Sequence, residues 1–101
     1  MLEQTRSVIG RLYDILRDNN SAAFNPKNSY RNAKDEIDGI IGIYPGEGKE
    51  IMAWLERNRG QIDYEIKKIS SLKVTERDME GLKDRENRRD VFDRLLEEYR
   101  H

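Results

Sequence analysis

Carboxylates are the most abundant side chains in this sequence that could do chemistry. Paired acids can act as general acid and base, or they can bind hard cations such as Ca²⁺. Lysine or arginine lies near each group, and neither a calcium-loop pattern nor the Glu-x-x-His motif of di-iron bundles occurs. We therefore expect solvent-facing helix surfaces, not metal or acid–base sites, at three groups: Asp35, Glu36 and Asp38; Asp63 and Glu65; Glu97 and Glu98.

Other catalytic groups are scarce. The sequence has no cysteine, which excludes disulfides, thiolate metal sites and cysteine nucleophiles. The only histidine is His101, so serine hydroxyls have no obvious base.

A phosphate-binding loop needs four residues between its first glycine and Gly-Lys, then serine or threonine. The segment 42–50 has five intervening residues and then Glu50, so we expect a helix–helix turn there. These patterns predict a non-enzymatic protein that needs no cofactor.

Binding to DNA is the alternative that the basic residues raise. Overall, 19 basic and 20 acidic residues give a net charge of −1, which argues against a generally cationic surface. Locally, the segment 51–83 resembles the core of a winged helix-turn-helix, with a break at Gly60 and a helix capped by Thr75. This resemblance implies a recognition helix that carries Arg77, Lys83 and Arg85. The full set of candidate DNA-binding residues is Arg77, Lys83, Arg85, Arg88 and Arg89.

The segment departs from the helix-turn-helix pattern in several ways. Lys67 occupies a position that usually holds a small residue, and no wing hairpin is evident. Acids on the recognition helix would face phosphates unfavourably: Glu76, Asp78 and Glu80. A DNA-associated regulator is therefore the alternative interpretation, and not the leading one.

The apolar pattern predicts an all-α fold with one domain spanning residues 1–101. Its longest stretch is 47–73, where Trp54 flanks a stripe at helical spacing: Ile51, Leu55, Ile62, Ile66 and Ile69. We expect four to five helices around this Trp-bearing helix, which is either continuous or a helix pair hinged at Gly60. Trp54 should be mostly buried.

Shorter segments complete the expected helices. Residues 2–18 form one helix, and residues 30–43 form a second helix that Asn28 or Ser29 caps. Residues 39–44 offer an alternative as a short strand. Thr75 with Asp78 resembles a capping box that starts a further helix. Residues 83–90 contain no apolar side chain and form either a solvated helix or a charged loop.

The C-terminal segment has a dense apolar face: Val91, Phe92, Leu95, Leu96 and Tyr99. Two placements are open. The segment either folds back to complete the core or projects and binds a partner or a second copy, because exposed apolar faces commonly mark interfaces. We take it as the candidate partner-binding surface.

The leading functional interpretation is an α-helical protein–protein interaction module, such as an adaptor, inhibitor or regulatory subunit, with self-association open. A second alternative is a structural subunit of a nucleoprotein or phage-like assembly.

No apolar run approaches the ~18–20 residues that span a bilayer. The N-terminal stretch also lacks the features of a signal peptide. We therefore expect a cytoplasmic protein with no membrane partner.

Overall fold

The computed structural model describes residues 1–18, 24–76 and 78–100. These residues form four α-helices and two short 3₁₀ helices: α1 (Glu3–Leu16), α2 (Pro26–Ile43), η1 (Pro45–Glu47), α3 (Gly48–Ser70), η2 (Val74–Glu76) and α4 (Met79–Tyr99). No strand occurs among the described residues, which confirms the all-α prediction. The alternative of a strand at residues 39–44 is wrong, because residues 39–43 form the last turn of α2.

Two predicted helix starts differ from the observed ones. α2 begins at Pro26, and the Asn25 side chain accepts a hydrogen bond from the Asn28 amide at 3.1 Å. Asn-Pro thus supplies both the cap and the first helical residue. α4 begins after Asp78, whose carboxylate accepts from the Gly81 amide at 2.9 Å, whereas Thr75 lies in η2. The charged stretch at residues 83–90 is helical.

The central helix is continuous. Gly60 lies in the interior of α3, so neither a hinged helix pair nor the helix-turn-helix break is present there. A glycine in a helix interior costs about 1 kcal/mol relative to alanine. Buried side chains on both sides of Gly60, including Ile51, Leu55, Ile62 and Ile66, anchor the helix and offset that cost.

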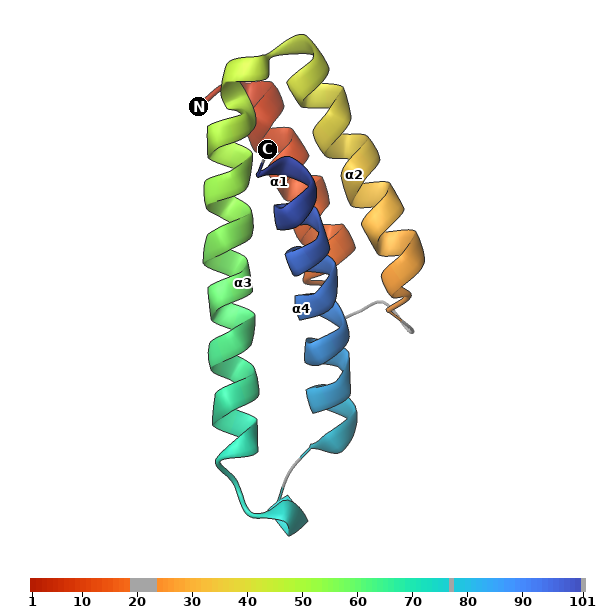
Figure 1. Ribbon diagram of the computed structural model, residues 1–101, viewed down its shortest axis with the longest axis vertical. Helices are drawn as coiled ribbons and strands as arrows, with labels where there is room; N and C mark the ends of the chain where they lie inside the picture. Colours follow the sequence, from red (N-terminus) through yellow and green to blue (C-terminus); the bar gives the residue numbers. More distant parts are fainter. Residues whose placement is uncertain (19–23, 77, 101) are drawn as a thin grey trace.

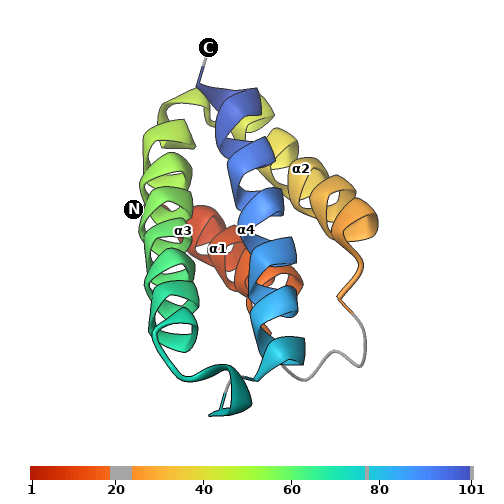
Figure 2. The same ribbon diagram turned by 60° about the horizontal axis from the view of Figure 1, so that its bottom comes forward.

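The helices pack in a closed arrangement, in which α4 contacts α3 and α2, while α1 contacts α2 and α3 (Figure 1). α3 and α4 form a long antiparallel hairpin, and its η2 end extends past α1 and α2. Figure 2 shows α1 behind this hairpin and α2 beside α4, and α1 and α2 also contact each other. The molecule measures 49 × 23 × 23 Å.

All four helices contribute to one core. Trp54 is 8% exposed, as the prediction of a mostly buried tryptophan requires, and its ring centre lies 6.0 Å from that of Phe92. The other buried apolar residues are Val8, Leu12, Leu16, Ala33, Ile37, Ile40, Ile51, Leu55, Ile62, Ile66, Val91, Leu95 and Leu96. This core fixes the relative positions of the surfaces described next.

Candidate functional site

The C-terminal apolar segment takes the core placement. Val91, Phe92, Leu95 and Leu96 are all buried. Tyr99 is half-buried, and its hydroxyl donates to the Asp38 carboxylate at 2.6 Å. Burial and the neighbouring Asp38 carboxylate raise the pKa of Tyr99, so this phenol stays protonated and keeps donating. In this fold, Val91, Phe92, Leu95 and Leu96 are interior packing of the chain, and only Tyr99 is partly on the surface.

The arginines expected to contact DNA bind acids of the same chain. Arg85 lies 3.0 Å from a Glu65 oxygen, and Arg89 lies 2.9 Å from an Asp63 oxygen. Arg88 is buried. Lys83 is exposed, and Arg77 lies outside the described residues. A phosphate would therefore have to displace existing ion pairs at Arg85 and Arg89.

Arg88 joins the last helix to the end of the first. Its guanidinium donates to the Leu16 carbonyl oxygen at 2.7 Å and to that of Asp18 at 3.2 Å. A third bond reaches Asp84 at 2.8 Å, and the Phe24 ring centre lies 4.4 Å away. The bond to Leu16 satisfies a carbonyl that the C-terminus of α1 leaves without a partner inside the helix. The sequence held a signal for this role, because Arg88 shares the apolar stripe of Phe92 at a spacing of four.

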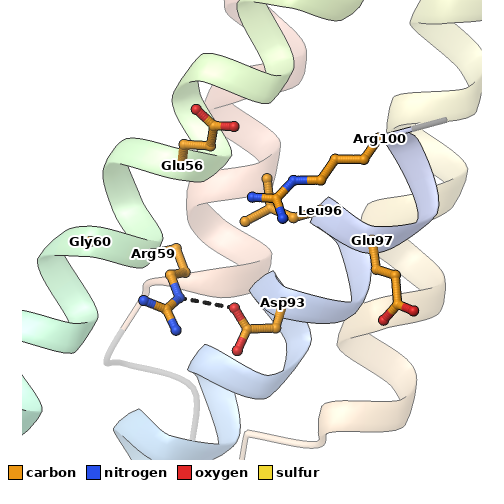
Figure 3. Close-up of a pocket in the computed structure, with 7 residues that line it drawn as sticks. All are labelled: Glu56, Arg59, Gly60, Asp93, Leu96, Glu97 and Arg100. Carbon is orange, nitrogen blue, oxygen red and sulfur yellow. Dashed lines mark hydrogen bonds and ion pairs between the residues drawn. The ribbon is translucent and has the colours of Figure 1, made fainter.

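A groove between α3 and α4 has a volume of about 570 Å³. Figure 3 shows Arg59 and Asp93 facing each other across it, joined by an ion pair of 2.9 Å. The remaining lining residues are Glu56, Gly60, Leu96, Glu97 and Arg100. Charges of both signs line this groove, so it does not favour a strongly charged ligand. Leu96 is its only large apolar residue and is buried, so the groove offers little apolar contact surface either.

A second groove, which we call the α1–α2 groove, has a volume of about 540 Å³ and a more apolar character. Val8 and Ile40 are buried at its base, whereas Ile43 at its rim is 71% exposed. Ile43 is the most exposed large apolar residue in the described part of the chain. The residues that line the groove are Gln4, Ser7, Val8, Arg11, Asp35, Glu36, Gly39, Ile40, Ile43 and Tyr44.

The charges of the α1–α2 groove lie at the end away from Ile43. Arg11 on α1 pairs with Glu36 on α2 at 2.7 Å. Asp35 is exposed and makes no ion pair with any described residue. Arg31, one turn earlier on α2, donates to Asn28 at 3.1 Å instead. The groove therefore has an apolar end and an end with one uncompensated negative charge.

Gly39 lies between these two ends. A Cβ atom at this position would meet nothing within 4 Å, so packing within the described chain does not require glycine there. The residue nonetheless carries the usual cost of a glycine in a helix interior. Glycine on a helix surface lets another backbone approach closely. The sequence alone did not reveal the groove, because only the fold brings Ser7 and Val8 beside Gly39 and Ile43.

Further features bear on membrane and metal binding. No helix in the described ranges is long and apolar enough to cross a bilayer. The described side chains include no cluster of three or more acids or histidines arranged to hold a metal ion.

No protein-family model, curated protein or solved structure matches this chain.

Proposed function

We propose that this protein is a non-enzymatic interaction module, an adaptor, inhibitor or regulatory subunit, that binds a helix of a partner protein in the α1–α2 groove. The observation that carries the proposal is Ile43, which is 71% exposed beside a base of buried Val8 and Ile40. Tyr44, the next residue of the groove lining, is also exposed, and neighbouring exposed apolar side chains commonly mark interaction sites.

The shape of the groove supports a helical partner. α1 and α2 lie side by side, and the furrow between two packed helices accepts the side-chain ridge of a third. The open space above Gly39 lets that helix come close to α2. An amphipathic helix laid into an apolar groove is a recurring mode of recognition, with anchors at helical spacings.

The alternative of a DNA-associated regulator finds less support. Arg85 and Arg89 bind Glu65 and Asp63, and Arg88 is buried. No specific observation favours a structural subunit of a nucleoprotein assembly. A second copy of the chain remains an outcome that the following experiment distinguishes.

Site-specific photo-crosslinking tests the proposal. A benzophenone amino acid replaces Ile43 in the groove or, as a control, Arg57, which is exposed on α3 and does not line the groove. In cells of the source organism, we expect a discrete crosslinked product from position 43 that position 57 does not give. A product of twice the chain's mass would identify a second copy. Identical patterns from both positions, or no product from position 43, would contradict the proposal.

A further inference from the structure

We infer that the partner helix is basic and amphipathic, with a lysine or arginine that pairs with Asp35 and an aliphatic residue that covers Ile43. This inference rests on the proposed function of the α1–α2 groove. It adds the chemistry and the spacing by which a partner would be recognised.

The charge of the partner follows from the ion pairs around the groove. Glu36 is neutralised by Arg11, which leaves Asp35 as the uncompensated charge of the lining. The adjacent Lys34 forms no ion pair with Asp35, because its ammonium group pairs with Asp38 at 2.8 Å and with Glu98 at 3.6 Å. A cation on the partner therefore gains an attraction at Asp35, and a carboxylate there is repelled.

The spacing follows from helix geometry. Asp35 and Ile43 are eight residues apart on α2, which corresponds to about 12 Å along the helix axis. A helix that lies along α2 returns to the same face after seven or eight residues. The partner must therefore carry its cation and its aliphatic anchor seven or eight positions apart. A small residue midway between them would face Gly39 and allow close approach.

A second copy of this chain does not supply that pattern. The cation must lie seven or eight positions from an exposed aliphatic residue. Within the described ranges, no lysine or arginine stands at that spacing from any exposed aliphatic residue: Met1, Leu2, Ile43, Leu72 and Met79. The occupant that fits the groove is thus a helix of a different protein.

Two synthetic peptides test the inference. Each is about 18 residues long, because shorter peptides are marginally helical in water. Both carry a leucine and a charged residue seven or eight positions apart, with an alanine midway between them. The charged residue is lysine in one peptide and glutamate in the other, and the peptides are otherwise identical. Each is made in both sequence orders. With fluorescently labelled peptides and the full chain, we expect the lysine peptide to bind at least about tenfold more tightly in anisotropy titrations.

Charge reversal in the groove provides the decisive comparison. Asp35→Lys should invert the preference, so that the glutamate peptide binds more tightly. Asp14→Lys is the matched control, because Asp14 is exposed on α1, lies outside the groove lining and gives the same change of net charge. Asp14→Lys should leave the preference for lysine in place.

The outcomes separate this inference from the proposed function. Equal binding of the two peptides, or inversion by Asp14→Lys as well as Asp35→Lys, would overturn the partner chemistry. If neither peptide binds but position 43 still gives its specific crosslink, the chemistry is wrong and the groove function stands. If neither peptide binds and no crosslink forms, both are overturned.

Discussion

Arg88 on α4 donates a 2.7 Å hydrogen bond to the carbonyl oxygen of Leu16, the last residue of α1. The arginine side chain is buried, and Leu16 is fully buried beside it. Many helices end in a glycine whose conformation lets backbone N–H groups bind the last carbonyl oxygens. Here the Arg88 guanidinium of α4 donates to such a carbonyl instead. This bond ties two helices that are far apart in the sequence.

The first prediction concerns this contact. Arg88→Ala removes the donors of the Leu16 and Asp18 carbonyl bonds and leaves Asp84 without its cation. We expect it to lower the free energy of unfolding by about 1–3 kcal/mol, because it leaves the buried Leu16 carbonyl without a donor. Arg89→Ala is the control, because Arg89 is only half-buried and should cost much less. Urea denaturation measures both, and equal losses would contradict the structural role of Arg88.

The second prediction concerns the C-terminal segment. Phe92 and Leu96 are buried against the rest of the chain, so replacing both with aspartate places two charges in the core. We expect the double variant to be an unfolded monomer with little helical circular dichroism. Tyr64→Asp, at a position that is 60% exposed, should keep the native spectrum. A folded double variant that has lost an assembly state would instead assign Phe92 and Leu96 to an interface.

The third prediction gives Gly39→Ala opposite effects on stability and binding. Alanine favours the helix, so the free protein should gain about 0.5–1 kcal/mol of stability. The added methyl group stands in the open space of the groove, so binding of the lysine peptide should weaken. Gly10→Ala is matched, since it lies in the interior of α1 and outside the groove lining, and it should stabilise without affecting binding. Unchanged binding by Gly39→Ala would argue against close approach at this position.

The fourth prediction concerns pH. Burial raises the pKa of Glu65, but hydrogen bonds from Arg17 and Arg85 outweigh burial, so the pKa lies below its ordinary value of 4.5. A carboxyl whose pKa is lower in the folded state stabilises the fold above its unfolded pKa, and this contribution disappears as the pH falls through the folded pKa. We therefore expect the urea midpoint to decline below about pH 4.5.

Glu65→Gln tests the origin of that decline. The variant should be less stable near neutral pH and should show a shallower loss of stability in acid, because one linked carboxyl is gone. Glu86→Gln is a suitable control, since Glu86 is exposed and makes no ion pair with described residues. Parallel pH profiles for wild type and Glu65→Gln would show that Glu65 does not contribute.

The fifth prediction concerns DNA. We expect no saturable binding to duplex DNA at about 0.15 M salt, because Arg85 and Arg89 already bind Glu65 and Asp63. Anisotropy titrations over a range of salt concentrations check this. Saturable binding that falls steeply with salt, and that Lys83→Glu with Arg85→Glu abolishes, would favour the DNA-associated alternative.

The sequence predicted the helices better than the surfaces. Apolar residues at helical spacing indicated the helices and the burial of Trp54, because this periodicity is a local property. Helix starts were less accurate. Several polar residues near each start can cap a helix, and the structure shows that Asn25, followed by Pro26, and Asp78 are the ones that do.

The candidate site could not be found from sequence, because it depends on which helices become neighbours. Val91 to Tyr99 have the composition of an interface, and only the packing of α4 against α3 and α2 shows that they lie inside. Conversely, Ile43 has the composition of a core residue. It is 71% exposed because it is the last residue of α2 and lies at the rim of the α1–α2 groove, where no described helix covers it.

The bond between Arg88 and Leu16 also has a consequence for the order of folding. The two residues are 72 positions apart, and a ribosome adding about 5–20 residues per second needs about 4–14 s to make that stretch. During this time α1 has emerged but its closing carbonyl has no donor from α4. The hairpin of α3 and α4 consists of contacts between segments close in sequence, which form quickly. The bond that closes the C-terminal end of α1 should therefore form late, only after α4 has been synthesised.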